Sequence, residues 1–348
     1  MMNTQLRSAR VTRSSLLVAA LATAGCVWAL AGPALAKSTI VTIDPPDSIG
    51  TYPWSMNEKG LITGFYYDSS DNTTKGFLRS TDGTITTFEH GKSKVTATYG
   101  IDAKGRATGY WSTPDGQFPG FIRKSDGKLK PFHAPGDVSG TFPVAMTAQS
   151  AITGSWYDLY AVPHGFLRTP DGTISEFDVS GDAYGTSPTA INASDSITGH
   201  WGDASGFNHG FLRTSDGSIT TFDAASGSTG TFAQGLNATG AIAGYYFDSS
   251  NIAHGFIRAA DGTFAQFDPS GSTYTYVASI NDDGDVAGYY YGGDGLAHGF
   301  VRKSNGKIQT FDPQGSTGTF ANFIDGKGAV VGFYTDNEDN YHGFLRTP

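Results

Sequence analysis

The stretch His209-Gly210-Phe211-Leu212-Arg213 decides the fold, because close copies of it recur along the chain at almost constant intervals. The glycine of this motif returns every 44 or 45 residues, at Gly76, Gly120, Gly165, Gly210, Gly255, Gly299 and Gly343. A second motif, apolar-x-Gly-x-aromatic, keeps the same step, with its glycine at Gly64, Gly109, Gly154, Gly199, Gly244, Gly288 and Gly332. The chain after residue 36 is therefore seven copies of one unit.

Each unit predicts four short strands separated by turns. In the fifth unit the expected strands cover Thr231–Leu236, Ala241–Phe247, His254–Arg258 and Thr263–Asp268. The first and third connections contain Gly240 and Gly262, which supply the positive φ that tight turns need. Four antiparallel strands in about 40–45 residues have the size of one β-propeller blade.

The two ends of the repeat region complement each other. The seventh unit stops at Pro348, directly after its third strand, and has no fourth. The segment Thr39–Asp44 resembles Ser218–Asp223, which is the fourth strand of the fourth unit. We therefore expect this N-terminal strand to complete the last blade of an all-β, closed seven-bladed β-propeller with four antiparallel strands per blade and no open edge.

Residues 1–36 contain the three parts of a secretory signal peptide. Three arginines lie between residues 7 and 13, an apolar run extends from Leu16 to Leu30, and Ala34-Leu35-Ala36 is a small-x-small cleavage site. We expect cleavage near Ala36, one propeller domain over residues 37–348, and a secreted or periplasmic protein.

Two alternatives remain for this segment. Thr23-Ala24-Gly25-Cys26 loosely resembles a lipoprotein signal, although apolar residues rather than a polar tether follow Cys26. The segment could also be a membrane anchor, but Gly32-Pro33 interrupts a run that is already short. Cleavage after Ala36 removes the chain's one cysteine, so packing without disulfides must hold the mature fold together.

The composition narrows the class of partner. The 348 residues carry 23 Lys and Arg against 32 Asp and Glu, and residues 1–36 contribute three arginines and no acid. An acidic mature chain argues against nucleic acid or an anionic membrane surface as partner, because both attract positive charge. We expect no membrane span in the mature chain, and its oligomeric state stays open.

The repeats resemble those of the HAF-type extracellular repeat proteins, which are named for a His-Ala-Phe-Leu-Trp core. This chain has His-Gly-Phe-Leu-Arg at residues 164–168, 209–213 and 342–346, and so differs at the second and fifth positions. The resemblance covers nearly the whole mature chain. It implies export and repetition, and it carries no defined activity and no catalytic residue.

Positions that stay constant between units are interpreted as scaffold. The motif arginine, such as Arg213, is expected to pair with the acidic residue that ends the fourth strand, such as Asp223. The histidine that opens the third strand, such as His209, is expected to cap a neighbouring loop, and the second-strand glycine to allow close packing of blades. The second-strand aromatic is expected to be core, with sugar stacking as the alternative. A threonine at the start of each first strand, such as Thr231, either lines the central channel or satisfies backbone groups.

A ligand is expected where the units differ. Three residues past the constant threonine, the first strands carry Trp54, Tyr99, Val144, Thr189, Gln234, Ala278 and Asn322. Aromatic and amide side chains suit stacking and hydrogen bonding with a carbohydrate or peptide. We therefore predict Trp54, Tyr99, Thr189, Gln234 and Asn322 as ligand-binding residues. The longer, acidic loops share one face, which we expect to be the binding face.

Catalytic signals are weak. In two neighbouring loops, Glu89-His90 and His133 stand where the other units have Asp. With Tyr99 nearby, Glu89, His90 and His133 are the candidates for acid/base chemistry. No nucleophile elbow, phosphate loop or zinc-protease motif occurs. Calcium loops at Asp68–Asp71 and Asp336–Asp339 lack the usual ligand spacing, so we predict no metal and no cofactor.

Together these patterns favour an exported binding protein for a carbohydrate or peptide at the loop-rich face. The first alternative is a carbohydrate-active enzyme, a polysaccharide lyase or hydrolase, that uses the same face. The second is a structural protein of the cell envelope.

Overall fold

The computed structural model describes residues 38–348, and this part of the chain is all-β. It contains 28 strands and no helix. Accordingly, no helix in the described range has the length and apolarity to cross a membrane. The predicted signal peptide lies outside the described residues.

The strands follow one another in groups of four. The first two groups are β2 (Ser48–Met56), β3 (Ile62–Asp68), β4 (Thr73–Arg79) and β5 (Ile85–Phe88), then β6 (Thr96–Ile101), β7 (Ala107–Trp111), β8 (Gly120–Arg123) and β9 (Leu129–Phe132). The third and fourth are β10 (Gly140–Met146), β11 (Ile152–Tyr157), β12 (Pro163–Arg168) and β13 (Ile174–Phe177), then β14 (Thr186–Ile191), β15 (Ile197–Gly202), β16 (Asn208–Arg213) and β17 (Ile219–Phe222).

The remaining groups have the same form. The fifth and sixth are β18 (Gly230–Leu236), β19 (Ile242–Phe247), β20 (Ala253–Arg258) and β21 (Phe264–Phe267), then β22 (Ser272–Ile280), β23 (Val286–Gly292), β24 (Ala297–Arg302) and β25 (Ile308–Phe311). The last group combines β26 (Gly318–Ile324), β27 (Val330–Thr335) and β28 (Tyr341–Thr347) with β1 (Thr39–Ile43).

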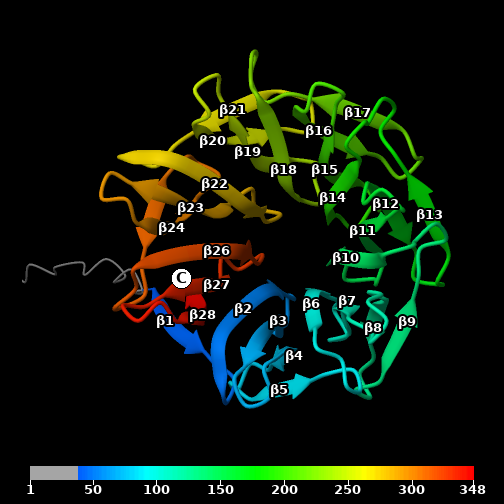
Figure 1. Cartoon of the computed structure of the whole chain (residues 1–348). Helices are drawn as coiled ribbons and strands as arrows, with labels where there is room; N and C mark the ends of the chain where they lie inside the picture. The colour runs from blue at the N-terminus through cyan, green and yellow to red at the C-terminus, as the bar shows by residue number, and fades with distance from the viewer. Residues whose placement is uncertain (1–37) are drawn as a thin grey trace, which may run out of the picture. The chain divides into compact units, whose positions relative to one another are not determined.

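Each group is an antiparallel ladder in which consecutive strands pair. The first strand of each group lies nearest a common centre and the fourth lies outermost (Figure 1). In the last group β1 pairs antiparallel with β28, with Thr39 opposite Thr347 and Ile43 opposite Gly343. The N-terminal strand therefore supplies the fourth strand of the last group, as the sequence predicts.

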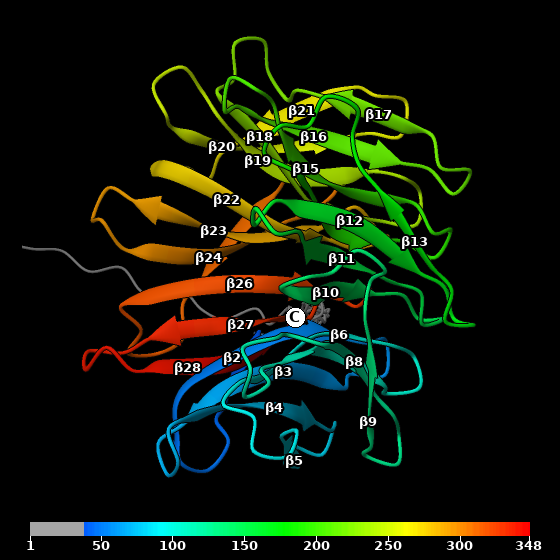
Figure 2. The same ribbon diagram turned by 45° about the vertical axis from the view of Figure 1, so that its right-hand side comes forward.

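Neighbouring sheets pack against each other and share buried clusters, as β22–β24 do with β26–β28 and β26–β28 do with β2–β4; Figure 2 shows these strands in succession. The motif phenylalanine forms the core between them, and in every unit it is completely buried: Phe77, Phe121, Phe166, Phe211, Phe256, Phe300 and Phe344. The motif glycine beside it has no room for a side chain. A Cβ on Gly210 would lie 2.3 Å from the ring of Phe222 on the fourth strand. Both constant residues are therefore required for packing.

The predicted pairing of the motif arginine with an acidic residue is wrong. Arg213 lies over the ring of Phe177 in the preceding sheet, with its guanidinium carbon 4.9 Å from the ring centre. Its Nε has no hydrogen-bond partner among the described residues. Five further arginines stack in the same way, namely Arg123, Arg168, Arg258, Arg302 and Arg346. A flat, weakly hydrated guanidinium can stack on an aromatic face while part of it stays in water, so no acidic partner is needed.

The acidic residue at the end of the fourth strand pairs with the constant histidine instead. Nδ1 of His254 lies 2.7 Å from Asp268, and its Nε2 lies 3.5 Å from Asp248 in the loop before the third strand. His164, His209, His298 and His342 lie between two aspartates in the same way. In the first unit Lys75 takes this place, with Nζ 2.8 Å from both Asp68 and Asp71. The histidine thus holds two loops together, which is the capping role that the sequence predicts.

The constant threonines do not line the central channel. All seven are fully buried: Thr51, Thr96, Thr141, Thr186, Thr231, Thr275 and Thr319. The hydroxyl of Thr186 accepts a hydrogen bond from the amide of Val179 and donates one to Asp182. Thr96, Thr141 and Thr231 likewise accept from a backbone amide of the entering loop, so the backbone-satisfying alternative holds in four units. Thr275 and Thr319 donate to an aspartate instead, and the Thr51 hydroxyl has no partner among the described residues.

Candidate functional site

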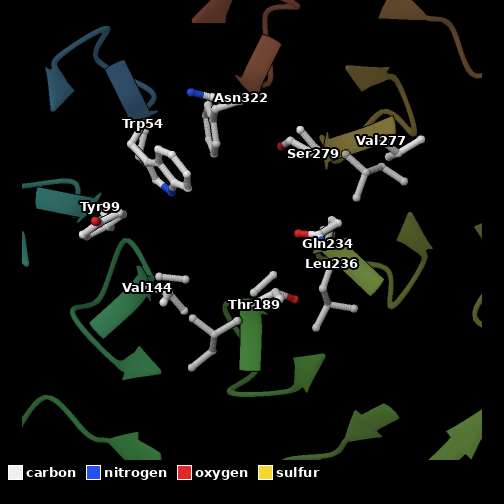
Figure 3. Close-up of a pocket in the computed structure, with 18 of the residues that line it drawn as sticks. Trp54, Tyr99, Val144, Thr189, Gln234, Leu236, Val277, Ser279 and Asn322 are labelled. Carbon is white, nitrogen blue, oxygen red and sulfur yellow. The ribbon is translucent and has the colours of Figure 1, made fainter. Parts of the chain in front are cut away.

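A cavity of about 490 Å³ lies where the first strands of the groups converge. Its wall includes the seven residues of the variable register, one from each group: Trp54, Tyr99, Val144, Thr189, Gln234, Ala278 and Asn322. Figure 3 shows six of them, all except Ala278, around a common space, with the Trp54 ring pointing into it. All five residues predicted to bind a ligand are therefore brought to one cavity.

A β-bulge explains why this register faces the cavity. Between β18 and β19, Ala233 pairs with Gly244 and Gly235 pairs with Ala243, so Gln234 has no partner on the second strand. The same shift skips the corresponding residue in the other six ladders. A bulged residue is released from the ladder and its side chain is turned away from the regular alternation. The scaffold therefore places few demands on which side chain stands there.

The second-strand glycine makes the bulge sterically possible. A Cβ on Gly244 would lie 2.1 Å from the carbonyl oxygen of Phe232, and a Cβ on Gly109 would lie 1.9 Å from that of Ala97. Such distances exclude any side chain. The sequence predicts that the second-strand glycine allows close packing between blades. The structure shows instead that it allows the first and second strands of one blade to approach each other.

The two predicted aromatic residues form one side of the cavity. The rings of Trp54 and Tyr99 meet edge to face, with centroids 5.2 Å apart, and Trp54 is 38% exposed. The Tyr99 hydroxyl lies 3.3 Å from the Tyr110 hydroxyl on the neighbouring strand. Burial, and then the nearby Tyr110, raise the pKa of Tyr99 well above its usual value, which disfavours this hydroxyl as a base. Trp54 is left as the exposed aromatic surface.

The three predicted polar residues differ in how free they are to bind. Thr189 donates to the carbonyl oxygen of Ala233 at 2.8 Å and so ties two first strands together. Asn322 donates its Nδ2 to the carbonyl oxygen of Pro53 at 3.0 Å, which leaves its Oδ1 as an acceptor. Gln234 forms no side-chain hydrogen bond within residues 38–348, and its amide oxygen points toward the cavity (Figure 3). Gln234 is therefore the most available polar group.

The cavity wall holds no Asp, Glu, Lys, Arg or His among the described residues. The wall also includes Ser55 and Ser279, which directly follow Trp54 and Ala278 and were not predicted from the sequence as site residues. In six blades the residue at this position is Gly, Ala or Ser, and in the seventh blade it is Phe323. In the fifth blade an added Cβ on Gly235 would lie 2.9 Å from the amide nitrogen of Ile280 in the next sheet. These small residues, recurring directly after the variable register, were the sequence signal for this part of the cavity wall.

The position of the cavity differs from the expectation of a site at the loop-rich face. Its wall includes Met146, Ile191, Leu236 and Ile280, which are the last residues of β10, β14, β18 and β22. These strand ends lead into the short turns. The predicted residues therefore lie along the inner strands, on the side of the short turns.

The weak catalytic candidates are not brought into one cluster. His90 stacks on Trp111 with ring centroids 3.8 Å apart. His133 contacts Asp137 at 3.1 Å, and Glu89 lies 3.9 Å from Lys75. In the described part of the chain, no hydrogen bond or ion pair joins any of the three to another. Each has a local partner instead.

The loops considered for calcium are occupied by protein contacts. Asp68 accepts hydrogen bonds from Ser70 and Lys75, and these, the Lys75 bond foremost, lower its pKa to about 2. Asp336 accepts from the amides of Glu338 and Asn340. No cluster of three or more His, Cys, Asp or Glu able to hold a metal ion occurs within residues 38–348.

Comparison with solved structures identifies the fold class. The chain is similar to virginiamycin B lyase from Staphylococcus aureus, with a TM-score of 0.55 and 16% identity over 90% of this chain and 99% of that one. It is also similar to the β-propeller domain of the Trilobed protease from Pyrococcus furiosus, with a TM-score of 0.59 and 12% identity over 85% and 95%. A puromycin hydrolase matches with a TM-score of 0.60 and 11% identity, over 86% of this chain and 53% of that one.

These similarities show a β-propeller fold, and identities this low carry no function across. The Trilobed protease domain is described as having an open velcro topology. No family model and no curated protein sequence matches the chain.

Proposed function

We propose that residues 37–348 form a closed seven-bladed propeller, exported after cleavage near Ala36, that binds an uncharged carbohydrate or peptide in its central cavity. The resemblance to HAF-type extracellular repeats and the three-part N-terminal segment support export. The protein would act in the secreted or periplasmic space as a binding module.

Contacts between the last and first blades support ring closure. The Asn322 amide of β26 bonds to Pro53 of β2, and the ring of Tyr52 lies 5.0 Å from that of Phe333. Ile43, Phe77 and Val331 share one buried cluster. The β1–β28 pairing removes the edge that an open last blade would expose.

One observation carries the binding proposal. The bulge register varies in every blade, while the glycines, threonines and phenylalanines around it stay constant, and all seven bulge residues line the same cavity. A repeated fold needs repeated residues, whereas an asymmetric ligand needs different groups around one space. The variable residues are therefore the ones that would contact a ligand and determine which ligand binds.

The chemistry of the wall indicates the ligand class. Trp54 offers a stacking face, and Gln234 and Asn322 offer amide groups, in a wall without charge. Sugar hydroxyls and peptide groups match such a wall, and a charged ligand would lose its hydration without an ionic partner. A hydrolase or lyase needs an acid or base within about 3 Å of the reacting group. The cavity lining offers no carboxylate, histidine or lysine for this role. Burial raises the pKa of its four tyrosines, which disfavours them as bases: Tyr99, Tyr245, Tyr276 and Tyr289. Binding is therefore favoured over turnover at this site.

An array of neutral glycans, acidic glycans and short peptides tests the proposal. The purified mature protein should bind members of a neutral class, and those ligands should be recovered unchanged. Product formation would favour the enzyme alternative, and the absence of any binding would favour a structural role. Mass spectrometry of the exported protein should find Lys37 at the N-terminus, and a lipid-modified Cys26 would contradict the processing that we propose.

A further inference from the structure

The loop between β11 and β12 carries the two most exposed large hydrophobic side chains of the described residues. Leu159 is 78% exposed and Tyr160 is 86% exposed. They lie at the tip of the loop, where Asp158 accepts hydrogen bonds from the amides of Tyr160 and Val162. The tip is therefore ordered by its own backbone contacts, and these two side chains take no part in holding it.

The fold does not require apolar residues at this tip. In the fifth blade Asp248 makes the same turn, accepting from the amides of Ser250 and Ile252, and the tip residues are Ser249 and Ser250. The corresponding pairs in the first, fourth and seventh blades are Ser69-Ser70, Ala204-Ser205 and Asn337-Glu338. Only the third blade has this turn with two bulky apolar residues. Such a departure from the repeat, fully exposed to water, marks an interaction site.

Neighbouring loops extend the apolar surface. Tyr184, 64% exposed, precedes Gly185, whose backbone packs on Pro163 at the end of the same loop. Tyr184 also lies against Gly202, where β15 runs into the loop that carries Phe207. Val138 donates its amide to the carbonyl oxygen of Tyr157, at the start of the Leu159 loop. We call this surface the apolar loop patch; it consists of Val138, Leu159, Tyr160, Tyr184 and Phe207, all more than 40% exposed.

The surroundings of the apolar loop patch are acidic. From residue 131 to residue 212 the chain has one Lys or Arg, Arg168, which is buried over Phe132. The loops that form the patch contain five aspartates, Asp137, Asp158, Asp178, Asp182 and Asp203. Three histidines contact four of them, His133 with Asp137, His164 with Asp158 and Asp178, and His209 with Asp203, so the carboxylates still outnumber the imidazoles. An apolar surface with an acidic rim attracts a partner that combines bulky apolar groups with positive charge.

We propose that the apolar loop patch docks a flexible, basic segment of a partner protein that inserts bulky apolar side chains between Tyr160 and Tyr184. A second copy of this chain fits less well, because the two acidic rims would face each other. An anionic membrane is disfavoured by the same charges. The site is independent of the cavity, whose wall contains none of the five patch residues.

The test uses the mature protein and three synthetic twelve-residue peptides, composed of alternating Lys and Leu, alternating Glu and Leu, or Lys and Ser. Binding is measured by fluorescence anisotropy at two salt concentrations. The key variant, L159S/Y160S, copies the tip of the fifth blade and so preserves the turn. The matched control, S249A/S250A, changes the same turn where we expect no docking.

The wild-type protein and the control should bind the Lys/Leu peptide at least tenfold more tightly than L159S/Y160S does, and more weakly at high salt. The Glu/Leu and Lys/Ser peptides should bind weakly to all three proteins. Equal binding of the Lys/Leu peptide by wild type and L159S/Y160S would overturn the proposal. So would concentration-dependent dimerisation in sedimentation velocity that L159S/Y160S abolishes, because the patch would then be a self-association surface.

Discussion

Gly244 lies directly against the carbonyl oxygen of Phe232, at a distance that leaves no space for a Cβ. This contact allows β18 to bulge at Gln234, two residues after Phe232, so that the Gln234 side chain leaves the ladder and lines the cavity. The same relationship recurs in every blade, with the glycine constant and the bulged residue variable. A constant scaffold residue thus makes a variable site residue possible.

Gly244→Ala should destabilise the protein strongly, because the new methyl group would lie 2.1 Å from a carbonyl oxygen that the backbone holds in place. We expect a loss of about 2 kcal/mol or more in the free energy of unfolding, measured by chemical denaturation. Gly293→Ala is the matched control, since a Cβ there meets nothing within 4 Å. A Gly244→Ala protein as stable as the control would show that the bulge does not need this glycine.

Arg213→Ala should lower the free energy of unfolding by about 1–2 kcal/mol, the combined effect of a lost cation–π contact and lost stem packing. It should not show the larger loss expected when a buried acid is left unpaired, because Arg213 contacts Phe177 rather than a carboxylate. Arg213→Lys should recover only part of the loss, since an ammonium group cannot stack flat on the ring. Thermal unfolding of both variants measures this, and full recovery by Lys would favour a simple charge interaction.

The His–Asp contacts predict a pH dependence of stability. Burial by itself would lower the pKa of His254, but the hydrogen bond and charge of Asp268, and then of Asp248, outweigh it and raise the pKa. The pKa values of His164, His298 and His342 are raised for the corresponding reason. The unfolded value is about 6.5, so this stabilisation is fully present below about pH 6.5 and is lost as the pH rises through the folded values.

Unfolding free energies of the wild type and of H254Q/H298Q, measured from pH 5.5 to 8.5, test this dependence. The difference between them should be largest at pH 5.5 and shrink toward pH 8.5. A difference that grows with pH would contradict protonated histidines between the aspartates.

Deleting Thr39–Asp44 should destabilise the protein and promote aggregation, because β28 would lose its partner and expose an unpaired edge. Moving the same residues to follow Pro348 should restore stability, since the strand could pair with β28 again. Denaturation and light scattering measure the two effects. A deletion variant as stable and soluble as the wild type would mean that β1 does not complete the fold.

The repeat made much of the fold predictable. Spacing of the motif glycines located the strands, and the likeness of Thr39–Asp44 to the fourth strand Ser218–Asp223 predicted the pairing of β1 with β28. The variable first-strand register around Gln234 could also be picked out from the sequence, because only its variability is needed for that step, and its role in ligand binding stays a prediction. Strand order alone puts Arg213 and the Asp223 segment side by side, but the antiparallel register sets Arg213 opposite Ile219 and brings Asp223 to the end of the pair where His209 lies. The stacking of the guanidinium on Phe177 of the preceding sheet could not be predicted, because it depends on side-chain geometry.

The sequence shows no clear sign of the bulge, because the first strands are too short for a one-residue shift in the alternation of side chains to stand out. The sequence also did not show that the Thr189 hydroxyl donates a hydrogen bond to the carbonyl oxygen of Ala233, whereas the Gln234 side chain forms no hydrogen bond among the described residues. Nor did it show that Glu89, His90 and His133 each have a separate local partner. These are differences of a few ångströms, which composition and spacing do not resolve.

The central claim is that the bulge residues form a ligand-binding cavity, and Ala278→Trp tests it most directly. The first blade already carries Trp54 at the equivalent bulge, so the fold accepts this side chain, while a second indole would occupy part of the cavity that a ligand needs. The measurement is calorimetric titration of the strongest neutral ligand from the array into the wild type and into Ala278→Trp, with thermal unfolding of both proteins. We predict at least a tenfold loss of affinity with an unchanged melting temperature. Unchanged affinity in the folded variant would place the ligand elsewhere and contradict the account.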